Sequence, residues 1–468
     1  MAKVTFLGAA REVTGSCHLL ESPSTGRIIL DCGMHQGGSP TSRLSRDNFE
    51  FDPETLDAVI LSHAHLDHSG LLPKLVNRGF NGPIYCTTAT AELLRIMLHD
   101  AYGLYKRELE RDALHAQRKG KKPALKPEYT ENDVEQVLDM CEPISYRTPR
   151  SLSPEANLSF FDAGHILGSA IVEITLTEQG KEKRLVFSGD LGNKDSKLMN
   201  DPEQLTRADL VLMESTYGNR NHRSMEETIS QLTDILRETW ERGGNIMIPA
   251  FAVGRTQEII FYLGRLYHEG LLNDWQVFLD SPMATEVTRV YDRWLHLLDD
   301  NDIRSLEDAD KESLEKFLPT LKISQTPQDS MAINEVESGA IIVAGSGMCT
   351  GGRIRHHIKH RIWREENTML FAGFQAQGTL GRNLVEGAKK IRMFNDEFAV
   401  LARIETLGGF SAHAGQVELV EWAKAFEQGT KFALVHGEML AMQVLATRLE
   451  AELGISVLMP EPNEQISF

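Results

Sequence analysis

Residues 62–70 read SHAHLDHSG and follow directly on the apolar run Ala58–Leu61. Three histidines and one aspartate within six residues, at a predicted turn from a strand to a helix, place several ligands in one small volume. Imidazole and carboxylate groups together suit zinc. An ordinary polar surface turn does not call for this density of ligand side chains. The stretch therefore predicts a metal site.

One such turn cannot supply every ligand of two metal ions, so further ligands are expected elsewhere. His165 lies between two predicted strands, and Asp190 ends the strand run that begins at Leu185. Ligands commonly gather outside strand ends in α/β proteins. Alone, His165 would be an ordinary loop histidine and Asp190 a turn or N-cap residue. The cluster at 62–70 makes both of them candidate metal ligands.

The composition is that of an ordinary globular protein, and the 468 residues suggest about two to three domains. The net charge of −18 disfavours a non-specific nucleic-acid coat or a basic membrane-surface protein but permits a local basic groove. Five cysteines without a C-x-x-C pair predict neither a disulfide framework nor a cysteine zinc site, and they favour a reducing compartment. With no signal-peptide pattern and no apolar run of roughly 18 residues, we expect a cytoplasmic protein without a membrane partner.

Short β-rich runs dominate the first part of the chain, and strand–helix alternation dominates after about residue 220. The predicted strands of the first part are Val4–Leu7, Ser16–Leu20, Arg27–Leu30, Ala58–Leu61, Pro83–Cys86, Leu158–Phe161, Ala170–Thr175, Arg184–Phe187 and Leu210–Met213, with a helix at Thr90–Arg111. Helices at 225–242, 254–269 and 285–298 alternate with strands at 245–248, 276–279 and 340–343. This alternation favours a second α/β domain with a covered parallel sheet. The end of the chain predicts a strand at 399–405, a helix at 416–427, a strand at 431–435 and a helix at 440–449.

The ligand pattern resembles that of the metallo-β-lactamase-fold hydrolases, whose signature is the H-x-H-x-D-H of residues 63–68 with a later His and Asp. The resemblance implies two zinc ions, one held by His63, His65 and His165 and the other by Asp67 and His68. It implies that Asp190 bridges them. It also implies that Asp31, which follows the run Ile28–Leu30, orients the metal-binding loop through hydrogen bonds.

Three further motifs resemble those of the β-CASP nucleases: Glu214 in MESTYG (213–218), His413 in FSAHA (410–414) and His436 in LVHGE (434–438). The small members of the superfamily lack an insertion of this size between Glu214 and His413. The resemblance implies an α/β fold, a metallo-β-lactamase αββα sandwich with an inserted α/β β-CASP domain. The predicted domains are the first part of the metallo-β-lactamase domain at 1–216, the inserted β-CASP domain at 217–390 and the C-terminal part of the first domain at 391–468.

By the same resemblance His436 completes the second zinc site, and His413 approaches the scissile phosphate as a general acid that Glu214 orients. Asp67 would also hold the proton of the attacking water. The best architectural match is the RNA-processing branch, which resembles the endonuclease subunit of the pre-mRNA 3′-end cleavage machinery and its shorter bacterial relatives. It implies a zinc-dependent ribonuclease that hydrolyses single-stranded RNA by two-metal activation of water, as an endonuclease or a 5′-exonuclease. Manganese is the alternative metal, and a homodimer is a possible assembly.

Three alternatives stay open at this point. A DNA-directed β-CASP nuclease would share most of the motifs, although a histidine at 436 favours RNA in family terms. A non-nuclease hydrolase of a small ester, thioester or lactam would share the zinc ligands but would need neither His413 nor the inserted domain. A catalytically silent binding subunit is disfavoured because every expected ligand is present.

Two glycine-rich loops of the predicted inserted domain, at 344–353 and 373–382, place backbone N–H groups at strand-to-helix junctions, where a phosphate can bind. Neither is a P-loop, and tight turns need glycine for their own geometry. With basic side chains close by, we predict contacts to RNA phosphates from Ser346, Gly347, Arg353, His356, His357, Gln375, Gly378, Thr379 and Arg382. The basic stretch Arg118–Lys126 is either a solvated loop or an extension of this groove.

Overall fold

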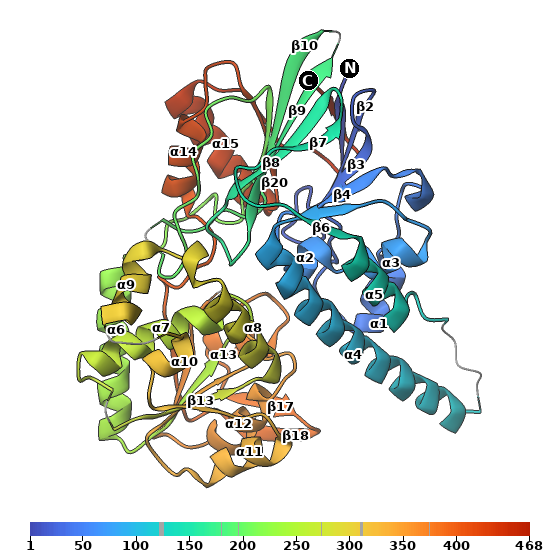
Figure 1. Cartoon of the computed structure of the whole chain (residues 1–468). Coiled ribbons are helices and arrows are strands. Elements are labelled where there is room, and N and C mark those ends of the chain that lie inside the picture. Colours follow the sequence, from blue (N-terminus) through green and yellow to red (C-terminus); the bar gives the residue numbers. More distant parts are fainter. Residues whose placement is uncertain (121–125, 179, 195, 273, 309–311, 374) are drawn as a thin grey trace. The chain divides into compact units, whose positions relative to one another are not determined.

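The computed structural model describes residues 1–120, 126–178, 180–194, 196–272, 274–308, 312–373 and 375–468. They form two compact units (Figure 1). The first contains residues 1–194, 200–221 and 413–468, and the second contains residues 195–199 and 222–412. Most of the basic stretch predicted around Lys121 and Lys122 lies outside the described residues. None of the helices in the described ranges has the length and hydrophobicity that a membrane span requires.

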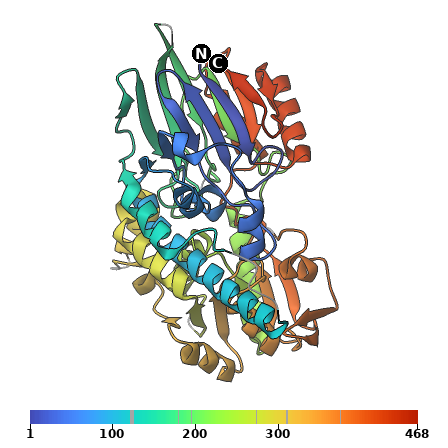
Figure 2. The ribbon, with the colours of Figure 1, turned by 90° about the vertical axis from the view of Figure 1, so that its right-hand side faces the viewer.

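The first unit contains two seven-stranded sheets. In spatial order, one consists of β22 (Gln465–Ser467), β1 (Lys3–Gly8), β2 (Cys17–Ser22), β3 (Gly26–Leu30), β4 (Ala58–Ile60), β5 (Ile84–Cys86) and β6 (Cys141–Pro143). The other consists of β21 (Val457–Leu458), β20 (Lys431–Val435), β11 (Leu210–Glu214), β10 (Lys181–Phe187), β9 (Ala170–Glu178), β8 (Ala156–Asp162) and β7 (Arg150–Ser153). The two chain ends lie close together where β22 pairs with β1 (Figure 2).

Helices cover the outer face of each sheet. The first sheet carries α1 (Pro40–Arg46), α2 (Leu66–Ser69), α3 (Leu72–Asn77), α4 (Thr88–Arg118) and α5 (Glu131–Met140), with a 3₁₀ turn at Pro53–Thr55. The second carries α14 (Gln416–Lys424) and α15 (Met439–Leu453). Between the sheets, apolar side chains such as Ile28 and Phe160 alternate inward along their strands and form a continuous core. The resulting layers, helix, sheet, sheet and helix, confirm the predicted αββα sandwich.

The second unit is built on a six-stranded parallel sheet. Its strands are, in spatial order, β14 (Leu321–Ile323), β13 (Gln276–Asp280), β15 (Ala340–Ala344), β12 (Ile246–Pro249), β16 (Thr368–Phe371) and β19 (Arg403–Thr406). Its helices are α6 (Met225–Glu241), α7 (Arg255–His268), α8 (Pro282–Arg293), α9 (Asp300–Asp308), α10 (Leu314–Phe317), α11 (Pro327–Ala332), α12 (Ile354–Arg361) and α13 (Leu380–Val385), with 3₁₀ turns at Leu295–Leu297 and Ile333–Glu335. A hairpin of β17 (Lys390–Met393) and β18 (Asp396–Ala399) completes it. The central strands are buried at every position, as in parallel sheets covered on both faces.

The unit boundaries differ from the predicted domain boundaries. Residues 391–412 belong to the second unit, because β19 pairs with β16 and extends the parallel sheet. Residues 195–199 also belong there, because the backbone N–H of Leu198 donates to Asp302 at 2.8 Å. The single strand predicted at 399–405 was wrong, since β18 ends at Ala399 and β19 begins at Arg403.

Candidate metal centre

The predicted ligands lie where strands of both sheets of the first unit end. Residues 62–65 connect β4 to α2, and Asp31 follows β3, which is the neighbour of β4. His165 lies between β8 and β9, Asp190 follows β10, and His436 follows β20. The loops that carry the predicted ligands therefore come from both layers of the sandwich and meet beyond its strand ends.

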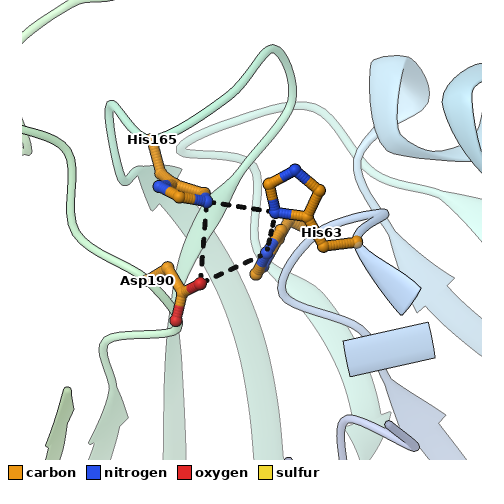
Figure 3. A group of neighbouring side chains, drawn as sticks. His63, His165 and Asp190 are labelled. Carbon is orange, nitrogen blue, oxygen red and sulfur yellow. Dashed lines mark hydrogen bonds and ion pairs between the residues drawn. The ribbon is translucent and has the colours of Figure 1, made fainter. Parts of the chain in front are cut away.

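A first cluster contains His63, His65, His165 and Asp190 (Figure 3). His65 Nδ1 lies 3.1 Å from His63 Nε2 and 3.2 Å from His165 Nε2. Asp190 Oδ2 lies 3.5 and 3.6 Å from the same two Nε2 atoms. Zinc–nitrogen bonds of about 2.0–2.1 Å in a tetrahedral site place neighbouring ligand atoms about 3.3–3.4 Å apart. These four donors therefore have the spacing of a zinc site.

A second cluster contains Asp67, His68 and His436. The Nε2 atoms of the two histidines lie 3.2 Å apart, and His68 Nε2 lies 3.4 Å from Asp190 Oδ2. The Asp190 carboxylate thus faces both clusters. Its Oδ1 atom is buried, and among the described residues it has no hydrogen-bond partner. A buried carboxylate oxygen left in this state fits a metal ion as its missing partner.

The protonation states favour cation binding. Burial lowers the pKa of His63 well below its usual value and that of His65 to about 4, so both rings are neutral, as metal ligands must be. Burial opposes ionisation of Asp190, but His436, His68 and His413 outweigh it and hold the pKa of this carboxyl well below its usual value. Burial likewise opposes a charge on His68, yet the Asp190 and Asp31 carboxylates raise its pKa well above normal. The Asp190 and Asp31 carboxylates thus stabilise positive charge beside them.

Asp31 holds the loop that carries these ligands. It is fully buried and adopts φ 60°, in the left-handed region. One oxygen accepts the backbone N–H of Ser62 at 2.7 Å, and the other accepts the Nδ1–H of His68 at 2.7 Å. Because Nδ1 of His68 is used in this way, Nε2 is the atom presented to the cluster. These hydrogen bonds are what the orienting role predicted for Asp31 requires.

Glu214 and His413 lie next to the first cluster. Glu214 is the last residue of β11, is fully buried, and accepts the backbone N–H of Leu191 at 2.7 Å. His413 Nδ1 lies 3.2 Å from Glu214 Oε1 and 3.9 Å from Asp190 Oδ2. Burial acts to lower the pKa of His413, but the Glu214 and Asp190 carboxylates raise it to about 9. The side chain is 22% exposed, so a charged imidazolium borders both the cluster and solvent.

Two contacts to the clusters were missed at the sequence level. Gln36 Nε2 donates to Asp67 Oδ2 at 3.3 Å, and Thr216 Oγ1 lies 3.1 Å from His436 Nδ1. Thr216 stands two residues after Glu214, within the quoted motif, and Gln36 stands five residues after Asp31. Both contacts could have been predicted from one signal, a polar side chain that follows a strand-end carboxylate within a few residues.

Two of the residues predicted to contact phosphate, Arg353 and His357, bind a buried carboxylate of the second unit. His357 is buried and donates its Nε2–H to Asp280 at 2.6 Å. Arg353 donates to the same carboxylate at 2.7 Å and to the backbone carbonyl of Ser324 at 3.1 Å. Asp280 ends β13 and is completely buried, so its charge requires such partners. Both side chains therefore serve the interior of the second unit.

The other predicted phosphate contacts are distributed over both glycine-rich loops and the helices that follow. Gln375 is buried and joins the loops, because its Nε2 donates to the carbonyl of Gly347 at 3.0 Å. Ser346 Oγ accepts the Gly351 N–H at 3.1 Å within its own loop. Thr379 caps α13, and Arg382 pairs with Glu386 at 2.7 Å. His356 is exposed. Contacts of RNA with all of these residues and with Gly378 stay predictions.

Replacing Asp280 with Ala is expected to destabilise the protein by about 3 kcal/mol, because removing one partner of a buried ion pair leaves the other uncompensated. Urea unfolding followed by circular dichroism measures the loss. The matched control is Asp234→Ala, which removes an exposed carboxylate on α6 and is expected to stay within about 0.5 kcal/mol of wild type. Equal unfolding free energies for the two variants would contradict the assigned role of Asp280.

Three family models match the chain. The metallo-beta-lactamase superfamily matches residues 10–148, the Beta-Casp domain residues 256–384, and the Zn-dependent metallo-hydrolase RNA specificity domain residues 397–460. The last of these spans both His413 and His436. The matched segments contain His63, His65, Asp67, His68 and His436, whereas His165 and Asp190 lie between two of them.

Named relatives cover nearly the whole chain. Ribonuclease TTHA0252 of Thermus thermophilus is 39% identical over 93% of both chains. Transcription termination factor FttA of Methanocaldococcus jannaschii is 32% identical over 93% of this chain and 67% of its own. An RNase J-like protein of the same organism is 30% identical over 98% of both chains. A solved structure of a protein of unknown function from Enterococcus faecalis V583 covers 99% of both chains with a TM-score of 0.52 and 13% identity, which shows a similar fold.

Proposed function

Because the chain belongs to the metallo-β-lactamase superfamily, as a β-CASP member related to RNA-processing nucleases, we propose that it hydrolyses phosphodiester bonds of single-stranded RNA with two metal ions. One observation carries the proposal: Asp190 faces two clusters of ligands at once. The proposed ligands are His63, His65 and His165 for one ion, Asp67, His68 and His436 for the other, and Asp190 for both.

The donor set fits two zinc ions, and manganese is the alternative that nitrogen and carboxylate donors also accept. When bound, such a pair lowers the pKa of a bound water toward 7 and stabilises charge on the phosphate oxygens. The protein holds the ligand side chains in position through hydrogen bonds. Asp31 contacts His68, Gln36 contacts Asp67, and Thr216 contacts His436.

Proton transfer falls to two side chains in this proposal. His413 donates a proton to the departing oxygen, a role that its raised pKa and its position beside the first cluster support. Glu214 accepts the Nδ1–H of His413 and so orients the ring, which leaves Nε2 as the atom that delivers the proton. Asp67 holds the proton of the attacking water.

The match to an RNA specificity domain and the relatives' names support RNA as the substrate. Either internal cleavage or 5′-exonuclease action is compatible with the proposed site. All five cysteines, each among the described residues, are free, which fits the proposed cytoplasmic location. A homodimer stays a prediction.

The test combines metal analysis with cleavage. Mass spectrometry of the purified protein is expected to find near two zinc or manganese ions per chain, and a 5′-labelled single-stranded RNA is expected to be cut faster than the matched DNA. A small thioester and a small carboxylic ester serve as control substrates. Faster cleavage of DNA would favour the DNA-directed alternative. Turnover of the esters without cleavage of either nucleic acid would overturn the proposal.

A further inference from the structure

The second unit carries an unusually basic segment at α12. Residues 353–364 read RIRHHIKHRIWR, with five Arg or Lys, three His and no acidic residue, in a chain whose net charge is −18. Three of these side chains point inward: Arg353 and His357 bind Asp280, and Arg361 donates to the side chain of Asn334 at 3.1 Å. The other basic side chains of the segment do not take part in these interior contacts.

An exposed aromatic ring lies against this segment. Phe394 is 41% exposed and occupies the turn between β17 and β18, the hairpin drawn beside α12 in Figure 1. The His356 ring stacks on it with centroids 5.0 Å apart and an interplanar angle of 28°. Arg355 Cζ lies 4.9 Å and Lys359 Nζ 5.8 Å from the ring centre. The ring is thus bordered by two cations and one imidazole.

The backbone at this turn makes the phenylalanine notable. Phe394 has φ 52° and Asn395 has φ 69°. Two-residue hairpin turns of this kind prefer Asn, Asp or Gly at both positions, and a bulky residue at positive φ is uncommon. Turn formation therefore does not explain a large apolar ring that remains partly open to solvent.

A second exposed ring lies just after the end of α12. Trp363 is 46% exposed, and Arg364 Cζ lies 4.9 Å from its ring centre. His356, Lys359 and His360 follow the helical i, i+3, i+4 spacing, so they share one face of α12. The helix ends at Arg361, and Trp363 lies in the turn that follows it. Two exposed aromatic rings, each with a cation close to its centre, thus lie at this basic segment.

We propose that this surface of the second unit binds single-stranded RNA through residues that are not metal ligands. We call it the aromatic platform and define it as Arg355, His356, Lys359, Trp363, Arg364 and Phe394. Bases stack on the two rings, and the three cations contact phosphates. Single strands fit because their bases expose π-faces that a duplex hides, and such platforms bind by stacking together with charge. Charge complementarity selects a polyanion in an otherwise acidic protein. The proposal rests on RNA being the substrate.

Phe394→Ala and Trp363→Ala test the platform. Stopped-flow anisotropy with a labelled single-stranded RNA, read before cleavage on the zinc-loaded full chain, is expected to show a Kd raised about 5- to 100-fold in each variant. Phe394→Tyr keeps a ring and is expected to bind like wild type, which separates stacking from folding of the hairpin. The matched control is Trp240→Ala, which removes a 43% exposed aromatic on α6 of the same unit. It is expected to leave the Kd for the RNA unchanged.

Charge is tested with Arg355→Ala and Lys359→Ala. Each is expected to reduce the slope of log Kd against log salt by about 0.7, the value for one phosphate contact to a single strand. Arg237→Ala, an exposed arginine on α6 paired with Asp234, is the control. Hydrolysis of bis(p-nitrophenyl) phosphate, which offers no nucleobase to stack and no chain of phosphates, is expected to be unchanged in all platform variants.

The outcomes separate the two proposals. Wild-type affinity in the Phe394→Ala/Trp363→Ala double variant, or an equal loss in Trp240→Ala, would overturn the platform while leaving RNA cleavage untouched. Platform-dependent RNA binding without cleavage would overturn the proposed activity and support the platform. Tighter binding of matched single-stranded DNA than of RNA would overturn the assignment of RNA as the ligand.

Discussion

Replacing Asp190 with Ala is expected to remove metal from both clusters and to abolish RNA cleavage. One carboxylate oxygen lies 3.4–3.6 Å from the Nε2 atoms of His63, His68 and His165. The other lies 3.4 Å from His436 Nδ1. Without this carboxylate both clusters lose an anionic donor. Because a bound metal pair is worth several kcal/mol in transition-state stabilisation, turnover should fall on the order of 10³-fold or more.

Mass spectrometry for metal and cleavage of 5′-labelled RNA measure both effects on the same preparation. Circular dichroism shows whether the fold is retained. Asp139→Ala, which removes an exposed carboxylate at the end of α5, is the control and should keep both metal and activity. A variant at position 190 that retains two ions per chain would refute the assignment of Asp190 as the shared ligand.

Replacing His413 with Ala is expected to slow RNA cleavage by about 10²–10⁴-fold while metal is retained. His413 lies 3.9 Å from Asp190 but is not part of either main cluster. Its Nδ1 is engaged by Glu214, and its pKa is raised to about 9, so the ring carries a proton at neutral pH. Loss of this proton donor should slow departure of the leaving oxygen without emptying the metal site.

The choice of substrate separates acid catalysis from other causes. Bis(p-nitrophenyl) phosphate has a leaving group that departs without protonation, so its hydrolysis should be nearly unaffected in His413→Ala, and imidazole in the buffer should restore part of the RNA cleavage. His115→Ala, at an exposed position on α4, is the control. Equal loss of metal in the His413 and Asp190 variants would show that His413 is a ligand and not an acid.

The strands of the sandwich and the ligand turn at 62–70 were predictable because their signals are local, whereas His436 entered the predicted site only through the resemblance to a known family. Short alternating strands, and a turn such as 62–70 directly after one of them, can be recognised within a few residues of sequence. Edge strands such as β6 and β7 were missed, because they are short and half-exposed and so carry little hydrophobic pattern. Helix α4 continues to Arg118. The prediction ended it too early, at Arg111, because the last turns of the helix lack the apolar period.

The partners of the basic side chains in the second unit could not be predicted from the sequence. Arg353 and His357 follow a glycine-rich loop, as phosphate-binding side chains do, but their partner Asp280 is 73 residues from Arg353. No local pattern reveals a pairing over that separation, and it decides whether a basic side chain faces solvent or the core. His356, one position away from His357, does not contact Asp280 and remains exposed. A rotation of about 100° around the helix thus separates an exposed histidine from a buried one.

The chain order of the first unit also governs when it becomes active. Its parallel pairing of β11 with β20 joins residues 210–214 to residues 431–435, so the second sheet is completed only by the last part of the chain. His413 and His436 emerge from the ribosome after every other residue of the proposed centre and after the whole of the second unit. Domains generally fold as units in the order of synthesis. An enzyme with the proposed activity therefore stays inactive during synthesis until the segment that carries His413 and His436 has been made and has paired with β11.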